Sequence, residues 1–265
     1  MTRVLIGIPT LNGPDRLDRV LASIRQHTDL TDVTVLVSDD ASTPNNLGHN
    51  KGMVHRHSVE MLMTEQRLGV SMQWNCLVRH VSDVEICVLL NDDVEVVDDW
   101  LDVLVFSLKE NPDLGMVALR CETGIVKGDC PPRPRVDYNE AHLLVGGGTL
   151  VSSGGACFAF RRADWEAVGG FDERYFCFYE EVDFGVKLAT ERNLFSAFAS
   201  YPVVYHMGGA TTSQHADIND VLVRSREAFT QKWGTTLDAL RRSLRERRRP
   251  DFLEWNSQWK YWRHP

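Results

Sequence analysis

The sequence has no long apolar run, no paired-cysteine motif and no overall excess of basic residues. Its six cysteines form no CxxC pair and show no zinc-site spacing, so we expect reduced thiols. The longest strongly apolar run, Ile86 to Leu90, is far shorter than the roughly 20 residues that cross a bilayer. The first residues, MTRVLIGIPTLN, lack the features of a signal peptide. These absences predict a cytoplasmic protein without a transmembrane segment, with peripheral contact at the inner face of the membrane as the remaining alternative.

The charge of the chain excludes one broad class of partner. A formal net charge of -8 argues against nucleic-acid binding over the whole surface, because phosphates are neutralised by an excess of Lys and Arg. Basic residues gather only locally, in RRSLRERRR at 241–249. This block is typical of a solvated helix face, and the alternative is a surface for anionic lipid or a polyanionic acceptor.

The C-terminal end is rich in aromatic residues beside basic ones. These rings either cover the core of their own fold, or they stack on sugars, bases or a lipid interface. The second interpretation allows a lipid-linked acceptor, a partner chain or, less favoured, a nucleic-acid acceptor. The residues concerned are Trp255, Trp259, Tyr261 and Trp262.

Apolar strand-like runs alternate with amphipathic stretches through the first half of the chain, which is typical of βα units around a mainly parallel sheet. With 43% apolar residues, the 265-residue chain can bury a full core. Between the first two runs, Leu17, Val20, Leu21 and Ile24 recur at helical spacing. We expect strands at 4–8, 33–38, 60–63 and 85–90, and helices at 15–26 and 69–80.

Polar loop residues follow the predicted strands. Pro9 and Asn12-Gly13 follow the first strand, Asp39 to Ser42 follow the second, and Asn91-Asp92-Asp93 follow the buried one. Because ligands bind at the carboxyl ends of strands in open α/β sheets, these loops should meet at one crevice. Residues 121–148, which include PPRP and GGG, indicate an irregular segment suited to a lid or acceptor loop.

Three groups of residues have the chemistry of a reactive site. Adjacent acids such as Asp92 and Asp93 suit Mg²⁺ or Mn²⁺, although a helix N-cap is the alternative. The acids of FYEEVD, which follow an aromatic run, suit a general base or simply begin an amphipathic helix. His206 follows a strand-like run, where it either completes a metal shell or has a structural role.

The order of these pieces resembles glycosyltransferase family 2, whose members have the GT-A fold. The resemblance spans about residues 3–233 and is carried by IGIPTLNGPDRLDRVLASI, VLVSDDAST, RLGVSMQWN, NDD, GGFDERYFCFYEEVDFGVKL and HMGGAT. It implies an α/β, Rossmann-like and mostly parallel central sheet flanked by helices. We therefore expect a GT-A glycosyltransferase domain at 1–233 and a helical, aromatic-rich C-terminal extension at 234–265 packed on it.

The resemblance also implies roles for individual residues on the donor side. Asp39 would bind the base of the nucleotide, and Asp93 would bind the metal with His206 as a further partner of the metal or the diphosphate. Asp92 would face the ribose or the metal. Asn91 departs from the family pattern because it replaces an acid, so it supplies an amide oxygen without charge. The other residues implied to bind the donor are Pro9, Thr10, Leu11, Asn12, Asp40 and Gly69.

On the acceptor side, Glu181 takes the place of the family's catalytic base, where aspartate is commoner. Glu180 lies beside it in the sequence, and Asp183 would orient the acceptor or a loop. The implied activity is metal-dependent transfer of a sugar from a nucleotide-diphosphate donor, of the UDP type, to an acceptor hydroxyl with inversion. The alternatives are a catalytically inactive nucleotide-sugar binding or scaffold protein and a nucleotidyltransferase, although IPTLNGPDR lacks the glycine-rich basic phosphate loop of the latter.

Overall fold

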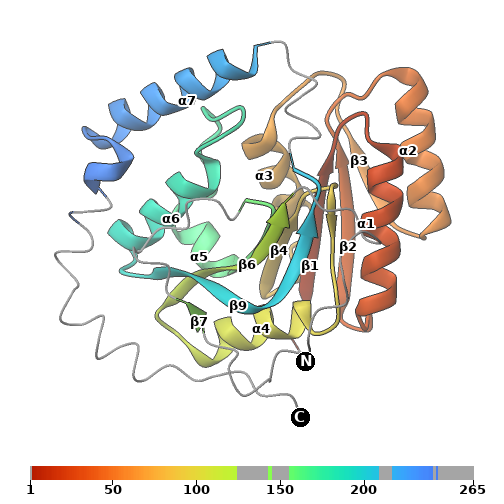
Figure 1. Cartoon of the computed structure of the whole chain (residues 1–265), viewed down its shortest axis with the longest axis horizontal. Helices are drawn as coiled ribbons and strands as arrows, with labels where there is room; N and C mark the ends of the chain where they lie inside the picture. The colour runs from red at the N-terminus through yellow and green to blue at the C-terminus, as the bar shows by residue number, and fades with distance from the viewer. Residues whose placement is uncertain (1, 124–142, 145–154, 209–216, 241–242, 244–265) are drawn as a thin grey trace.

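A single sheet with helices on both faces forms the protein (Figure 1). The structure, a computed structural model, describes residues 2–123, 143–144, 155–208, 217–240 and 243. Within these residues nine strands pair in the order β3-β2-β1-β4-β8-β6-β9-β5, and β7 pairs with β9 outside this path.

The N-terminal half of the sheet is parallel and is built from βα units. Its strands are β1 (Val4–Thr10), β2 (Val33–Asp39), β3 (Glu60–Met63) and β4 (Ile86–Leu90). The connecting helices are α1 (Pro14–His27), α2 (Pro44–Arg56) and α3 (Val70–His80). The predicted strands and the first and third helices are confirmed, whereas α2 was not predicted.

The other half of the sheet mixes strand directions. Strand β8 (Cys157–Arg161) is antiparallel to both β4 and β6 (Leu114–Thr123), and β9 (Phe195–His206) is parallel to β6. Two short strands, β5 (Val94–Glu95) and β7 (Leu143–Leu144), are antiparallel to β9. The remaining helices are α4 (Trp100–Glu110), α5 (Arg162–Ala167), α6 (Glu180–Glu191) and α7 (Ile218–Trp233). The predicted fold class, a mostly parallel sheet flanked by helices, is confirmed.

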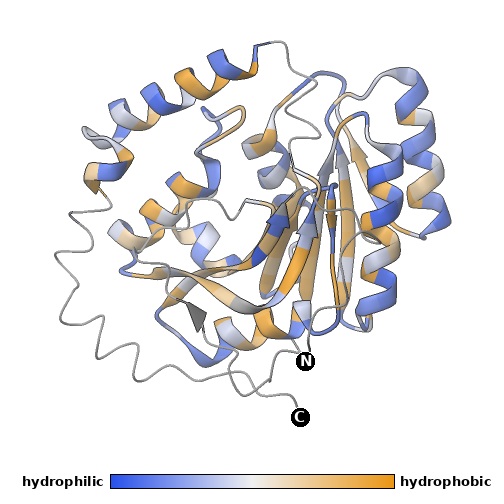
Figure 2. Cartoon of the chain, viewed as in Figure 1, coloured by the Kyte–Doolittle hydropathy of each residue, from blue (hydrophilic) through white to orange (hydrophobic). Residues whose placement is uncertain are grey.

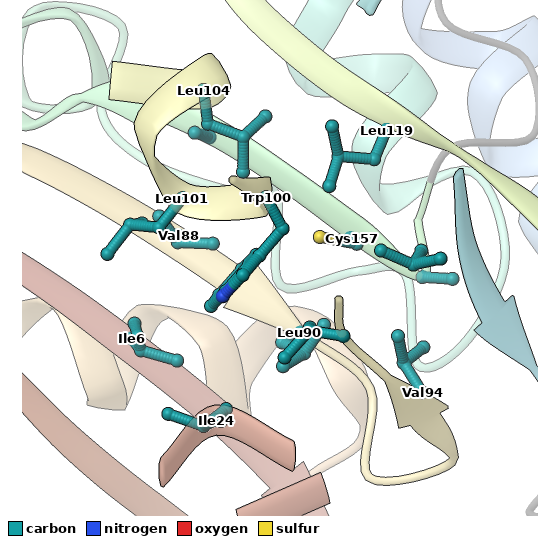
Figure 3. Packing of buried hydrophobic residues seen from close by; sticks show 14 of the residues in the cluster. Ile6, Ile24, Val88, Leu90, Val94, Trp100, Leu101, Leu104, Leu119 and Cys157 are labelled. Atoms are coloured by element: carbon teal, nitrogen blue, oxygen red, sulfur yellow. The ribbon is translucent and has the colours of Figure 1, made fainter. Parts of the chain in front are cut away.

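The core has one layer on each face of the sheet, because successive strand residues point to opposite faces. Ile6 packs with α1, α2 and α4 on one face, whereas Leu5 packs with α3, α5 and α6 on the other. Trp100 is fully buried in the first layer beside Leu90 and Cys157 (Figure 3). The hydrophobic sides of the helices face the sheet and their hydrophilic sides face outward (Figure 2).

Several predicted features fall partly or wholly outside the described residues. Of the basic block at 241–249, only residue 243 is described. The four aromatic residues near the C-terminus lie outside the described residues. The irregular segment is described only up to Thr123 and at Leu143–Leu144. Leu237 and Leu240 pack against the small cluster that α6 and α7 form. The domain boundary stays a prediction. In the described part of the chain the cysteines are unpaired, and no helix is long and apolar enough to span a membrane.

Candidate active site

The loops after β1 and β2 lie side by side at the carboxyl edge of the parallel strands. The amide of Asp40 donates to the carbonyl of Thr10 at 2.9 Å. Asn12, with φ of 49°, donates its amide to Ser42 Oγ at 2.8 Å and accepts from the amide of Thr43 at 2.8 Å. Side-chain acceptors commonly organise turns in this way. The structure therefore joins the two loops that the sequence analysis assigned to the nucleotide.

Asp39 is held rigidly within these loops. One carboxylate oxygen accepts from the amide of Ser42 at 2.8 Å, and the other accepts from the side-chain amide of Asn50 at 2.7 Å. Asp39 is only 1% exposed. Two donors fix the carboxylate as an acceptor, and each oxygen keeps a second lone pair for a further N–H. Asn50 was not identified from the sequence.

Asp40 organises the start of α3. Its carboxylate accepts from the amides of Leu68 at 2.7 Å and Gly69 at 3.1 Å, and from the side chain of Gln73 at 2.9 Å. Arg67 also donates to it at 3.3 Å. These contacts make Asp40 a support for the loop that carries Gly69.

Gly69 joins this loop to the segment before α6. Its φ is +82°, and a Cβ at this position would lie 2.5 Å from the carbonyl oxygen of Phe176. The amide of the next residue, Val70, donates to that same oxygen at 2.7 Å. Only glycine allows both this backbone conformation and this close approach.

Asp92 is buried and bound inside the protein. It is 3% exposed, and it accepts from Thr10 Oγ1 at 2.7 Å and from Arg16 Nε and Nη2 at 3.3 and 3.2 Å. Burial raises the pKa of this carboxyl, and the charge of Arg16 opposes that effect. Arg16 also donates to the carbonyl of Leu11 at 3.0 Å, so it links the first loop to the acidic motif. This arginine was not predicted from the sequence.

Asp93 and His206, both predicted to bind the metal, lie together. The antiparallel pairing of β5 with β9 places Val94 opposite His206, and the amide of Met207 donates to the carbonyl of Asp93 at 3.0 Å. The distance from His206 Nε2 to Asp93 Oδ1 is 3.2 Å. No group of three or more His, Cys, Asp or Glu suited to a metal occurs in the described residues. An ion held here would therefore need further oxygen ligands from a substrate.

Glu181 lies beside the chain segment that is bonded to the acidic motif. A Cβ built on Gly155 would lie 3.4 Å from Glu181 Cδ, so the carboxyl group faces Gly155. The carbonyl of the next residue, Ala156, accepts from the amide of Asn91 at 2.9 Å. The antiparallel neighbours β4 and β8 thus bring Glu181 to the edge that also carries Asp93. Gly155 was not identified from the sequence.

Glu180 is buried, unlike its neighbour. It is 7% exposed, and its Oε2 atom has no hydrogen-bond partner in the structure. Burial, and then the charge of Glu181, raise the pKa of Glu180 well above its usual range. The structure therefore favours a neutral Glu180.

We expect Glu180→Gln to flatten the pH dependence of stability. Between the ordinary pKa near 4.5 and the raised folded-state pKa, the folded protein holds a proton that the unfolded chain releases. Stability therefore falls as the pH rises through this window, and glutamine removes that loss. Thermal unfolding from pH 5 to 8 should show that the Tm of the variant rises relative to the Tm of the unsubstituted protein as the pH increases. An equal difference at every pH would contradict the buried neutral acid.

Asp183 lies on the side of α6 that faces α7. It is fully buried, and it accepts from Tyr175 Oη at 3.1 Å, Lys232 Nζ at 2.6 Å and Trp233 Nε1 at 2.8 Å. These contacts fit a residue that fixes α6 against α7. The predicted role of Asp183 in orienting an acceptor remains a prediction.

An α/β sheet with donor loops, an acidic motif and a carboxylate at one edge defines the GT-A class of nucleotide-sugar transferases. Residues 5–169 match the family described as "Glycosyl transferase family 2". The chain belongs to glycosyltransferase family 2, and it is a glycosyltransferase that uses a nucleotide-sugar donor.

Two curated relatives support this assignment. The chain is 26% identical over 246 residues to the N-acetylglucosaminyl-diphospho-decaprenol L-rhamnosyltransferase of Mycobacterium tuberculosis, and the match covers 80% of this chain and 78% of that protein. It is also 26% identical over 233 residues to the O-antigen biosynthesis protein RfbC of Myxococcus xanthus, with 81% of this chain and 18% of that protein covered.

Solved structures share the fold. The mannosyltransferase PcManGT of Pyrobaculum calidifontis, in complex with GDP-Man and Mn²⁺, matches with a TM-score of 0.60 and 22% identity over 77% of this chain. GalNAc-T7 with UDP, GalNAc and Mn²⁺ matches with a TM-score of 0.64 and 15% identity over 78% of this chain. The match spans 56% of the first structure and 44% of the second, so the chain covers about half their length.

Proposed function

We propose that this glycosyltransferase moves a sugar from a UDP-type donor to an acceptor hydroxyl with inversion, that it depends on Mn²⁺ or Mg²⁺, and that Glu181 is the general base. The observation that carries the proposal is the placement of Glu181 against Gly155, next to the Ala156–Asn91 hydrogen bond. The base and the acidic motif then face one edge of the sheet.

The residues at this edge fit a divalent ion that is shared with a diphosphate. Asp93 and His206 offer a carboxylate oxygen and an imidazole nitrogen 3.2 Å apart, and Asn91, with its amide oxygen, lies two residues before Asp93 in the sequence. Mg²⁺ and Mn²⁺ accept such a partial set when phosphate oxygens complete the shell. The ion would stabilise the charge of the leaving diphosphate.

The donor pocket in this proposal lies at the joined loops after β1 and β2. Asp39 accepts the imino N–H of a base such as uracil through a free lone pair, because Asn50 and Ser42 already fix its orientation. Pro9, Thr10, Leu11 and Asn12 line the base and ribose. Asp40 and Asp92 have supporting roles. Asp40 holds the Gly69 loop, and Asp92 joins the acidic motif to Thr10 and Arg16.

In the transfer step, Glu181 removes the proton of the acceptor hydroxyl while its oxygen attacks the anomeric carbon. The bond from that carbon to the diphosphate breaks, and the nucleoside diphosphate leaves with the electron pair. A single displacement with one base inverts the anomeric configuration. The names of the relatives suggest a glycan or lipid-linked acceptor. Membership of the family argues against a nucleotidyltransferase and an inactive scaffold.

We expect the purified protein to hydrolyse a single nucleotide sugar slowly in the presence of Mn²⁺ or Mg²⁺. Incubation with a panel of UDP, GDP and dTDP sugars, with and without EDTA, measures nucleoside diphosphate release and identifies the donor. Hydrolysis that persists in EDTA would contradict the proposed metal dependence. If no donor is hydrolysed, calorimetry with the nucleoside diphosphates follows, and the absence of any binding would contradict the assigned donor pocket.

A further inference from the structure

Helix α7 packs on the outer side of α6, away from the sheet (Figure 1). Val182 and Val186 of α6 form a small core with Phe229 of α7, separate from the two layers on the sheet. Within the described residues, α7 is the first element after His206 at the end of β9. Helix α7 therefore packs directly on the helix whose first turn carries the proposed base.

The turn that leads into α6 has an unfavourable backbone conformation. Phe178 and Tyr179 have φ of 69° and 72°, although neither is glycine. Such conformations persist only when the surrounding structure holds them. Two contacts from α7 do so, because Ser225 Oγ donates to the carbonyl of Cys177 at 2.7 Å and the ring of Phe229 lies 5.3 Å from that of Tyr179.

A second set of contacts from α7 lies on the other side of Glu181. Lys232 and Trp233 donate to the fully buried carboxylate of Asp183 at 2.6 and 2.8 Å. Lys232 also donates to Asp172 at 2.8 Å, where Arg174 forms a further ion pair. A buried ion pair fixes geometry tightly, since loss of one partner leaves a buried charge.

We infer that α7 is a clasp for the turn that carries the base, with Ser225 and Lys232 as positioning residues for sugar transfer. The clasp consists of Ser225, Phe229, Lys232 and Trp233. It holds the chain at Cys177 and Asp183, and Glu181 lies between these two points. The inference rests on the proposed role of Glu181, and it adds residues that act through the backbone of the turn and through the first turn of α6.

The clasp predicts that the two polar contacts affect kcat far more than donor affinity, because they hold Cys177 and Asp183. The carbonyl of Phe176, which supports the Gly69 loop of the donor pocket, is held separately by the amide of Val70. Displacement of a base by about 1 Å costs on the order of 100-fold in rate, so we expect a loss of about 30-fold for Lys232→Met and about 5-fold for Ser225→Ala. The KM for the donor and the Kd for the nucleoside diphosphate should change less than about twofold. Lys232→Arg should recover most of the rate, because it keeps a cation for both carboxylates.

The experiment measures kcat, donor KM, nucleoside diphosphate binding and Tm for these variants. Val103→Ala is the control, because Val103 is buried in the layer on the opposite face and its loss should lower Tm without lowering kcat. Ser225→Ala removes one hydroxyl and serves if Lys232→Met does not fold. A fall in kcat at constant donor KM, with recovery in Lys232→Arg, supports the clasp.

Two outcomes would overturn the inference. One is full kcat in Ser225→Ala together with full kcat in Lys232→Met, or full kcat in Ser225→Ala alone if Lys232→Met does not fold. The other is a fall in kcat that Val103→Ala reproduces at the same loss of Tm. Glu181→Gln, measured in parallel, separates failure of the clasp from failure of the proposed base. Full activity in Glu181→Gln would refute the role of Glu181 as the base. An inactive Glu181→Gln with fully active Ser225→Ala and Lys232→Met would refute only the clasp.

Discussion

Glu181→Gln is expected to lower kcat for sugar transfer by about 1000-fold, because an amide of the same shape cannot take the acceptor proton. The donor KM and the Kd of the nucleoside diphosphate should stay unchanged, since Glu181 faces Gly155 rather than the loops after β1 and β2. Transfer to the natural acceptor, or to water in the hydrolysis assay, is followed by chromatography of the released nucleoside diphosphate.

The matched control for this variant is Glu181→Asp, which keeps the carboxylate but shortens the side chain. We expect it to retain more activity than the glutamine variant, because the carboxylate can still take a proton and only its distance from the acceptor hydroxyl changes. An active Glu181→Gln, or a loss of nucleotide binding that explains its whole effect, would show that the base lies elsewhere.

Asp93→Ala should abolish the metal-dependent part of the activity, a loss of about 100-fold or more, because stabilisation of the leaving diphosphate is lost. His206→Ala should have a smaller effect, since a neutral imidazole contributes no charge. Calorimetry with Mn²⁺ and the nucleoside diphosphate should show that Asp93→Ala no longer couples their binding. The hydrogen bond from the amide of Met207 to the carbonyl of Asp93 uses backbone atoms and survives the substitution.

Asp98→Ala is the control for the acidic motif. Asp98 lies five residues after Asp93, in the connection between β5 and α4. Its side chain is 81% exposed, and its partner is His27 rather than a residue of the site. This variant should keep both its metal dependence and its rate. If Asp93→Ala responds to Mn²⁺ as strongly as Asp98→Ala does, Asp93 does not bind the metal.

The sequence predicted the parallel half of the fold because its periodicity is strong. Leu17, Val20, Leu21 and Ile24 are all buried, as their helical spacing required. Helix α2 escaped prediction because only Asn50 and Val54 in it are buried, so it carries little apolar pattern. The β8, β6 and β9 part was not predicted in detail, since its pairing depends on partners far apart in the chain.

The prediction of the candidate site shows the same division. Motif order predicted that Asp93 and His206 belong together, and the β5–β9 pairing brings them within 3.2 Å. The partners of the acids were not predicted. Arg16 is indistinguishable in sequence from a solvated arginine on an amphipathic helix, although it binds Asp92. Lys232 likewise resembles a basic residue in the last turn of a surface helix.

The contact between Gly69 and Phe176 limits how the protein could be shortened. The family match ends at residue 169, whereas the amide of Val70 depends on a carbonyl at Phe176. A fragment cut at the end of the match would leave that amide and the closely packed glycine exposed to water. The smallest unit that binds a nucleotide sugar therefore extends beyond the matched residues, and a truncation series that keeps the Gly69 loop intact must keep the segment before α6 as well.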